Sequence, residues 1–244
     1  MKQPDENLIV DFYNRKWTIE DRRHVELCED EIARMVAIRS ALEAHKPTGL
    51  VDVLDYGCGT AWLAAYLPRR FRITGVDISD QAISAATRMF PEHRFVCASV
   101  FDDVLSGEQF DAVVSQEVIE HLPTERQEEY IARCRSYLRA NGCLVLTTPN
   151  KWALINMRRY LGLSLEHLGE QPVENPLTIR QLRRMAEKYF RITRLYTVYD
   201  PIAHSGLHRV LYSVKLRRFV PGWCYLPHLL NAKLRIVLIA NKRS

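Results

Sequence analysis

A short apolar segment that runs through a glycine turn into a helix is the feature that most constrains the fold of this chain. Residues 51–55 (VDVLD) predict a buried strand, Gly57 and Gly59 follow directly, and residues 61–67 have helical spacing. A strand, a tight glycine turn and a helix in this order are typical of a doubly wound α/β sheet, in which ligands bind where the strands end. We therefore expect a ligand site at this turn.

The rest of the chain continues this alternation of strands and helices. Short apolar segments predict further strands at 71–77, 95–98, 110–115, 143–148, 192–199 and 234–240. Helical spacing or end signals predict helices within 1–49 and at 79–90, 124–138 and 178–189. The predicted fold is a Rossmann-like, doubly wound, mostly parallel seven-stranded α/β sheet with N-terminal helices and a helical lid between the last two strands.

The length of 244 residues suits one large domain with a small lid. We divide the chain into four parts by pattern and charge. These are an N-terminal helical cap at 1–49, a nucleotide-binding core at 50–200, a basic and aromatic lid at 201–232, and the final strand of the core at 233–244.

The composition is that of a soluble globular protein, with 47% hydrophobic and 26% charged residues. Its six cysteines are scattered and form no Cys-x-x-Cys pair, so we interpret them as reduced thiols. The polar residues 1–6 lead into no apolar segment, and no apolar stretch is long enough to cross a bilayer. We therefore expect a cytoplasmic protein.

The charge is concentrated at one end of the chain. Residues 205–244 hold eight Lys or Arg and no Asp or Glu, whereas the whole chain has a net charge of +5. Such a segment favours an anionic partner, which would be a phosphorylated substrate, an acidic membrane surface or nucleic acid. A solvated basic face would have the same composition.

An acidic residue ends the second predicted strand at the spacing that a nucleotide site requires. Asp77 follows Gly59 by 18 residues and can accept hydrogen bonds from both hydroxyls of a ribose. A nicotinamide-dinucleotide site uses the same elements but needs a small residue where Trp62 stands. The pattern therefore indicates a different adenosine cofactor.

Four segments resemble the successive motifs of class I S-adenosylmethionine-dependent methyltransferases: VLDYGCGTAWLA, ITGVDIS, FDAVVSQEVIEHL and NGCLVLTTPN. The likeness covers about residues 51–150 and is strongest to the ubiquinone-biosynthesis O-methyltransferase-like group. It implies S-adenosylmethionine as the cofactor, held around its methionine part by the loop after the first strand. The cofactor-binding residues that it implies are Asp55, Gly57, Cys58, Gly59, Asp77, Ile78, Ser99, Val100 and Gln116. The family usually has an Asp where this chain has Ser99, and nearby Asp102 is the alternative adenine contact.

The sequence Glu117-Val-Ile-Glu120-His121 follows the fourth of these strands. If a helix begins there, the two carboxylates and the imidazole share one face, where they could bind a divalent ion or leave His121 as a general base. Three ligands leave a coordination sphere incomplete, so we predict His121 and Glu117 as catalytic residues and no metal site. His204 and His208 are alternatives to His121, and His167 lies close to where the resemblance would place a further metal ligand.

The predicted function is methyl transfer from S-adenosylmethionine to a hydroxyl of a small or lipid-like metabolite in small-molecule biosynthesis, with an anionic acceptor as one option. The acceptor pocket would use residues 205–228 with Tyr13 and Trp17. Two alternative reactions are N-methylation and RNA 2′-O-methylation. An alternative of another class is a non-catalytic subunit that binds the cofactor or recruits a partner. We expect no DNA partner, and the sequence carries no stacking motif for RNA. Peripheral membrane contact through the basic C-terminal segment is consistent with its charge.

Overall fold

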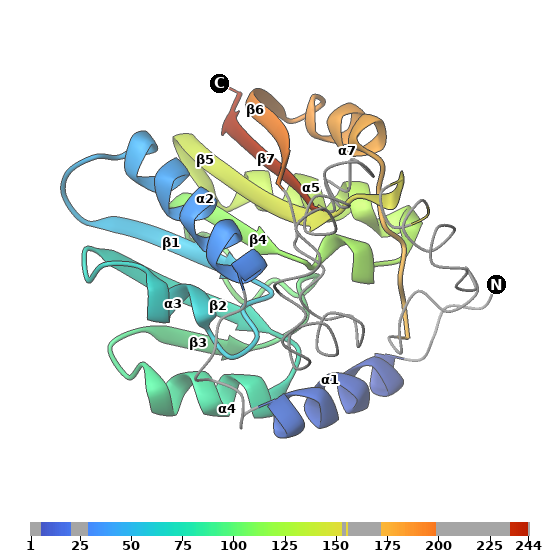
Figure 1. The fold of residues 1–244 in the computed structure, drawn as a ribbon. Helices are drawn as coiled ribbons and strands as arrows, with labels where there is room; N and C mark the ends of the chain where they lie inside the picture. The colour runs from blue at the N-terminus through green and yellow to red at the C-terminus, as the bar shows by residue number, and fades with distance from the viewer. Residues whose placement is uncertain (1–5, 21–28, 153–154, 156–171, 199–234, 244) are drawn as a thin grey trace, which may run out of the picture.

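The chain forms one seven-stranded sheet with helices packed on both of its faces (Figure 1). The structure, a computed structural model, describes residues 6–20, 29–152, 155, 172–198 and 235–243. The strands are β1 (Val51–Tyr56), β2 (Phe71–Asp77), β3 (Arg94–Cys97), β4 (Phe110–Gln116), β5 (Leu138–Pro149), β6 (Phe190–Val198) and β7 (Arg235–Lys242). Their order across the sheet is β3-β2-β1-β4-β5-β7-β6.

Strands β1 to β5 are parallel, and β7 runs antiparallel between β5 and β6. The carboxyl ends of the five parallel strands therefore meet at one edge of the sheet, which is where ligands bind in this architecture. The predicted mostly parallel seven-stranded sheet is confirmed, and the last strand in the sequence is the one that reverses direction.

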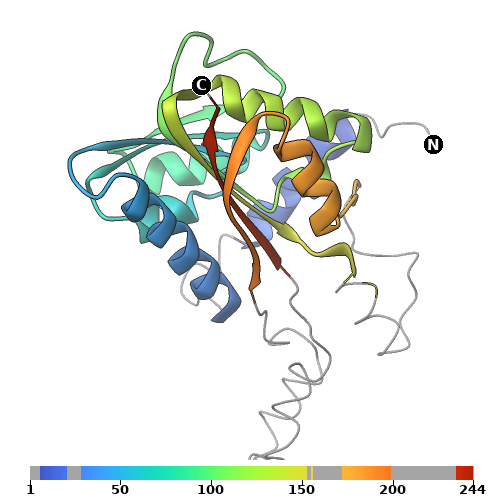
Figure 2. The ribbon, with the colours of Figure 1, turned by 90° about the horizontal axis from the view of Figure 1, so that it is seen from above.

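Helices cover the sheet in two layers. They are α1 (Glu6–Glu20), α2 (Glu29–His45), α3 (Trp62–Tyr66), α4 (Asp80–Met89), α5 (Gln127–Ser136) and α7 (Ile179–Ala186), with the 3-10 helices η2 (Ile119–His121) and η3 (Thr124–Arg126). Figure 2 shows α2 on one side of the sheet and α5 with α7 on the other. The apolar side chains of each layer form a separate core cluster against one sheet face, so the sheet is buried on both sides.

Local signals explain where two of these helices begin. The Ser79 hydroxyl accepts a hydrogen bond from the Ala82 N–H at 3.2 Å and so caps α4, as the sequence predicts. Thr178 and Gln181 form a capping box at the start of α7, in which each side chain reaches the other residue's backbone.

Two predicted boundaries around α5 differ from the structure. The helix predicted at 124–138 begins as a 3-10 turn and becomes α-helical only at Gln127. The strand predicted at 143–148 already begins at Leu138, because Asn141 adopts a left-handed conformation (φ 63°) inside the strand. Asn tolerates this conformation, and the pairing with β4 shifts register between Phe110 and Ala112. Asn141 therefore marks an irregularity within one long strand.

The two N-terminal helices occupy different places. Helix α2 packs on a sheet face, whereas α1 lies alongside α4 (Figure 1). The predicted lid at 201–232 lies outside the described residues, and the division into four parts remains a prediction.

Two smaller expectations concern the cysteines and the membrane. Cys58, Cys97, Cys134 and Cys143 are free thiols, in agreement with the predicted reduced state for this part of the chain. Among the described helices, none combines the length and the apolar character needed to cross a bilayer.

Candidate functional site

The loop after β1 is shaped by two glycines that no other residue could replace without rearrangement. Gly57 (φ 91°) donates its N–H to the Val76 carbonyl at 2.8 Å, and Gly59 has φ 51°. A Cβ at Gly57 would lie 2.4 Å from the Val118 side chain, and a Cβ at Gly59 would lie 2.7 Å from the Trp17 ring. The predicted requirement for glycine thus has both a conformational and a steric cause.

Asp77 fastens this loop to the end of β2. Its Oδ2 atom accepts the Gly59 N–H at 2.8 Å, and its Oδ1 atom accepts the Ser79 N–H at 3.0 Å. The carboxylate is half-buried and lies directly beside the glycine loop. The structure therefore brings together the two features that the sequence places 18 residues apart.

Asp55, at the end of β1, is completely buried, and neither carboxylate oxygen has a hydrogen-bond partner in the described part of the chain. Burial, and next the carboxylate of Asp77, raise the pKa of Asp55 to about 7. The buried Thr60 Oγ1 and Gln116 Oε1 atoms also lack partners among these residues. Buried polar groups are normally hydrogen-bonded, so this group fits a polar ligand that binds at the ends of β1 and β4.

Cys58 and Ile78 flank this loop without offering reactive groups. The Cys58 N–H donates to the Val76 carbonyl at 3.0 Å, and burial raises the pKa of its thiol well above the ordinary value. Cys58 is therefore a neutral packing group. Ile78 is half-buried, and its carbonyl accepts a 3.7 Å hydrogen bond from the Cys97 thiol.

Ser99 and Val100 follow β3 at the same edge. The Ser99 N–H donates to Asp102 Oδ2 at 2.9 Å, so the carboxylate of Asp102 turns back onto the loop. The Val100 carbonyl accepts a hydrogen bond from the Tyr56 hydroxyl. These contacts fix the loop that the resemblance assigns to the adenine.

The predicted shared helical face of Glu117, Glu120 and His121 is wrong. Strand β4 ends at Gln116, and Glu117 takes a left-handed conformation with φ 54°. Only the short 3-10 helix Ile119–His121 follows. The turn at Glu117 breaks the helical spacing that would have placed the three side chains together.

The Glu117 carboxylate forms ion pairs with two arginines instead. Its Oε1 atom accepts the Thr147 hydroxyl at 2.9 Å and lies 3.8 Å from the Arg34 guanidinium, while Oε2 pairs with Arg235. Within the described residues, no three His, Cys, Asp or Glu side chains form a group that could hold a metal ion.

His121 keeps the geometry of a base. Its Nδ1 atom lies 3.2 Å from the Val173 carbonyl, which can only accept, so we assign the proton to Nδ1 and the acceptor electron pair to Nε2. Nε2 lies 3.7 Å from Glu120 Oε1. Glu120 is buried and accepts the Thr148 hydroxyl at 2.9 Å. Burial, and next Glu117, raise its pKa well above the ordinary value, which favours its neutral form at neutral pH.

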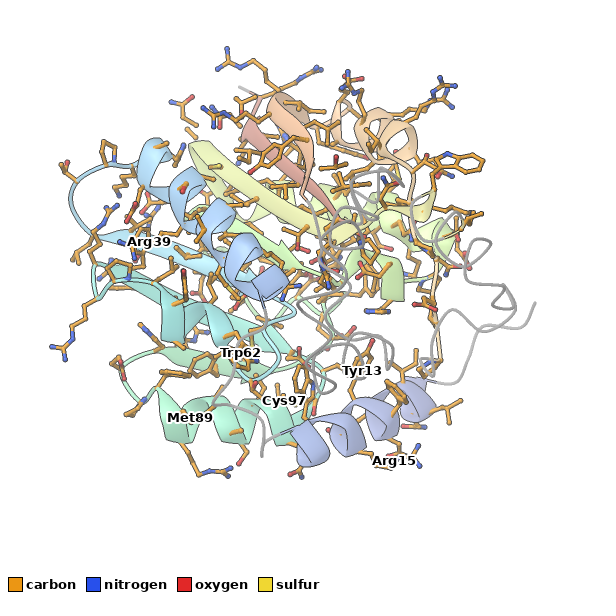
Figure 3. The ribbon with its side chains drawn as sticks, viewed as in Figure 1. Tyr13, Arg15, Arg39, Trp62, Met89 and Cys97 are labelled. Carbon is orange, nitrogen blue, oxygen red and sulfur yellow. The ribbon has the colours of Figure 1, made fainter. Side chains whose placement is uncertain are left out.

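Helix α1 brings three further side chains over this edge of the sheet. The Tyr13 ring, labelled in Figure 3, lies 6.2 Å from the His121 ring between centroids. The Ser79 hydroxyl donates to Asn14 Oδ1 at 2.6 Å, and Trp17 lies against the glycine loop. Burial raises the pKa of Tyr13, so its hydroxyl keeps its proton. The sequence hypothesis named Tyr13 and Trp17 as acceptor-pocket residues but missed Asn14.

Arg34 on α2 is the second residue that the sequence did not mark. Its side chain is only 12% exposed, and its Nε atom is buried without a partner among the described residues. Its charge lowers the pKa of Asp55, against the larger effect of burial. No spacing or motif could have identified it, because its role depends on how α2 packs against the sheet.

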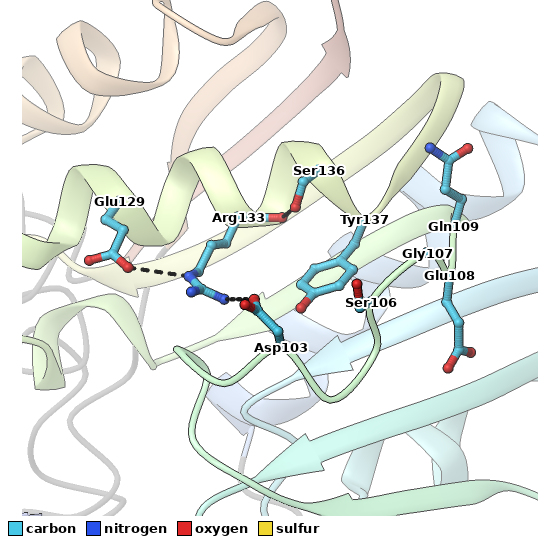
Figure 4. A pocket seen from close by; sticks show the side chains of 9 residues that line it. All are labelled: Asp103, Ser106, Gly107, Glu108, Gln109, Glu129, Arg133, Ser136 and Tyr137. Carbon is cyan, nitrogen blue, oxygen red and sulfur yellow. Dashed lines mark hydrogen bonds and ion pairs between the residues drawn. The ribbon is translucent and has the colours of Figure 1, made fainter.

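Other predicted residues lie elsewhere. His167, His204 and His208 fall outside the described residues. A surface cavity of about 460 Å³ lies between the loop before β4 and α5 (Figure 4) and contains none of the predicted site residues. Its Arg133 is paired with Asp103 at 3.0 Å and Glu129 at 3.3 Å. The candidate site is therefore the carboxyl edge of the sheet under α1.

Comparison with known proteins shows what the chain is similar to. Residues 53–142, which include the glycine loop and His121, match a family model described as a methyltransferase domain. Ubiquinone biosynthesis O-methyltransferase of Agrobacterium fabrum is 28% identical over 184 residues, which are 70% of this chain and 67% of that protein. Its counterpart from Rickettsia canadensis is 25% identical and aligns over 51% of this chain, and the chain spans about half (53%) of that relative. The predicted resemblance to S-adenosylmethionine-dependent methyltransferases is confirmed.

Solved structures share the fold at lower identity. N-methyltransferase NodS from Bradyrhizobium japonicum WM9, in complex with S-adenosyl-L-homocysteine, has a TM-score of 0.67 at 12% identity and covers 97% of this chain and 99% of its own. Magnesium protoporphyrin IX methyltransferase (ChlM) from Synechocystis PCC 6803, with the same product bound, has a TM-score of 0.67 at 18% identity, with 98% and 100% covered. The [4+2]-cyclase SpnF has a TM-score of 0.57 at 18% identity, with 84% and 80% covered. The fold alone therefore does not determine the reaction.

Proposed function

We propose that this chain, whose residues 53–142 match a methyltransferase domain, uses S-adenosylmethionine to methylate a hydroxyl of a small or lipid-like molecule. The observation that carries the proposal is the buried, unpartnered carboxylate of Asp55 beside the glycine loop and Asp77. A native protein rarely leaves such a group without a hydrogen bond, so it indicates a polar ligand at this point.

The charges around the loop suit the two ends of the cofactor. Asp77 offers its carboxylate to the ribose hydroxyls. Asp55 offers a negative group to the ammonium of the methionine part, and the buried Arg34 guanidinium offers a positive group to its carboxylate. Gln116 and Thr60 supply further unpartnered oxygens at the same edge.

When bound, S-adenosylmethionine supplies a methyl group on a positively charged sulfur. The contribution of the protein is to hold the acceptor oxygen in line with that methyl and to remove its proton. His121 suits the second task because the Val173 carbonyl accepts from Nδ1, so that Nε2 is the ring nitrogen whose electron pair would take the proton. Tyr13 lies beside the same ring and keeps its own proton, so it can donate a hydrogen bond to the acceptor.

A hydroxyl acceptor is favoured over an amine by the presence of this base. An alcohol or phenol reaches the site protonated, whereas an amine can react as its neutral form without a base. Two kinds of relative also carry O-methyltransferase names, including malonyl-[acyl-carrier protein] O-methyltransferase of Halalkalibacterium halodurans at 28% identity over 126 residues.

The charge of the C-terminal segment is the basis for the proposed nature of the acceptor. The concentration of eight basic residues in 205–244 supports an anionic or lipid-like acceptor, and with it peripheral contact with a membrane surface. RNA and DNA remain unsupported as partners, and the cytoplasmic location stays a prediction.

The test of the proposal is turnover with S-adenosylmethionine and panels of phenols, hydroxylated lipids and matching amines, with the demethylated product measured by mass spectrometry. We expect hydroxyl acceptors to turn over and His121→Gln to lower the rate by about 10²- to 10⁴-fold. The control is His93→Gln, since His93 is half-buried just before β3, where its Nδ1 atom accepts the Ile73 N–H at 3.5 Å. Turnover of amines alone, or equal rates for both variants, would contradict the proposal.

A further inference from the structure

The turn that carries His121 is held by a buried side-chain amide at the start of α5. Gln127 is 1% exposed, and its Nε2 atom donates to the Ile119 carbonyl at 3.0 Å and to the Asn175 carbonyl at 3.0 Å. Both amide hydrogens are therefore used. They join Ile119, which lies 8 residues before Gln127, to Asn175, which lies 48 residues after it. A buried amide with both donors paired is a rigid connection.

The segment that contains Asn175 returns these contacts to the turn. The Asn175 N–H donates to the Glu120 carbonyl at 2.6 Å, and its side-chain Nδ2 donates to the Leu122 carbonyl at 3.1 Å. Two residues earlier, the Val173 carbonyl meets Nδ1 of His121 at 3.2 Å. The segment 172–177 is thus joined to the turn 119–122 at Val173 and at Asn175.

The far end of this segment is anchored to the sheet. Leu177 pairs with Asn150 in a parallel bridge just after β5, and its carbonyl accepts the Lys151 N–H at 3.0 Å. The capping box of Thr178 and Gln181 then starts α7. The position of the Val173 carbonyl therefore depends on the contacts between the segment and the turn, and on the link from Asn175 to Gln127.

We infer that Gln127 is a positioning residue for His121, which it holds in the tautomer with the proton on Nδ1 by keeping the Val173 carbonyl against the ring. The inference rests on the proposed function for its relevance to methyl transfer. The free neutral side chain of histidine prefers the opposite tautomer, with the proton on Nε2. That tautomer has no electron pair at Nε2, the atom that faces Glu120 and the site.

Replacing the Gln127 amide should therefore change the His121 tautomer, although Gln127 does not contact the imidazole ring. Gln127→Met keeps the length and the apolar part of the side chain but removes the amide donors from the carbonyls of Ile119 and Asn175, of which Ile119 keeps the Leu122 N–H at 3.3 Å. The segment 172–177 then loses one of its links to α5, and the Val173 carbonyl is no longer fixed against Nδ1. A role confined to stability would lower the melting temperature but leave the tautomer unchanged.

The experiment is ¹⁵N–¹H correlation spectroscopy of the histidine rings in the full chain at neutral pH, with His121 assigned by its loss in His121→Gln. We expect a protonated Nδ1 and an unprotonated Nε2 in the wild type, and a shift toward the Nε2–H tautomer in Gln127→Met. The matched control is Tyr130→Phe, which removes another buried α5 donor that contacts the Tyr56 carbonyl and the Ser115 hydroxyl. Its His121 signals should match the wild type.

A folded Gln127→Met variant with wild-type ring signals would overturn the inference. If that variant does not fold, Gln127→Asn serves instead, because its amide stays neutral but is one methylene shorter and cannot reach both carbonyls from the same backbone position. An unchanged His121 tautomer in folded Gln127→Asn would equally overturn it. The spectra need no cofactor or acceptor, so failure to find methyl transfer would leave this result standing.

Turnover gives the functional readout once an acceptor is known. Gln127→Met should lower kcat on the order of 10- to 100-fold with little change in KM for the cofactor, because it misplaces a base rather than a binding group. In the His121→Gln background, the same substitution should cost nothing further. Equal losses in both backgrounds would show that Gln127 acts independently of His121.

Discussion

Replacing Asp55 with asparagine should make the protein more stable at neutral and alkaline pH while weakening cofactor binding. The reason is that Asp55 is completely buried and has a pKa near 7 in the folded chain, against about 3.8 for the ordinary group. Because the folded-state pKa is the higher one, the folded chain is destabilised progressively as the pH rises from about 4 to about 7, and the full penalty persists above that range.

The size of the effect follows from this shift. Three pKa units correspond to about 4 kcal/mol of unfavourable free energy for the ionised form. Burial of an unpaired asparagine amide costs about 1–3 kcal/mol, which leaves a net gain of about 1–3 kcal/mol at pH 8. At pH 4 the gain disappears, since Asp55 is then neutral in the folded state.

Urea denaturation at pH 4 and pH 8 measures this difference in the free energy of unfolding. Asp111→Asn is the matched control with the opposite sign. Burial opposes ionisation of Asp111, but Lys46, the Asp52 N–H and Arg139 outweigh it and lower the pKa. The control should therefore lose stability at pH 8. If Asp55→Asn is no more stable than the wild type at pH 8, the account of Asp55 as a strained, ligand-seeking carboxylate is refuted.

Three further predictions test other parts of the site. Gly59→Ala should abolish cofactor binding because its Cβ meets the Trp17 ring. The control is Gly49→Ala, whose Cβ would lie in open space, so that the left-handed backbone (φ 78°) is the only cost. Equal cofactor binding by both variants would contradict the steric role of Gly59. Arg34→Met should weaken binding of S-adenosylmethionine, measured by calorimetry, more than binding of methylthioadenosine, which lacks the carboxylate. Equal weakening of both ligands would exclude that role. A chelator should leave turnover unchanged, since Glu117 is paired with arginine, and a loss restored by Mg²⁺ would refute this.

The parts of the fold set by local patterns could be predicted from the sequence. Alternating apolar strands and helices indicate the doubly wound sheet, and the glycine loop and Asp77 identify its ligand edge because their spacing follows from one strand–helix–strand unit. The antiparallel direction of β7 is not visible, since an apolar strand has the same pattern in either direction.

The proposed catalytic residues could be predicted only by their types. Glu117, Glu120 and His121 have helical spacing in the sequence, but the left-handed backbone at Glu117 turns its carboxylate toward Arg34 and Arg235. The contacts that define His121 come from segments distant in sequence, at Tyr13 and Val173. Tertiary packing of this kind leaves no periodic signal.

The most direct test of the central claim is titration calorimetry of the full chain with S-adenosylmethionine and S-adenosylhomocysteine. The wild type should bind both ligands, and Asp77→Ala should bind neither while remaining folded. The control, Asp80→Ala, removes an exposed carboxylate three residues beyond Asp77 and should bind both. Absence of binding to the wild type, or unchanged affinity in Asp77→Ala, would contradict the assignment of this edge of the sheet as the cofactor site.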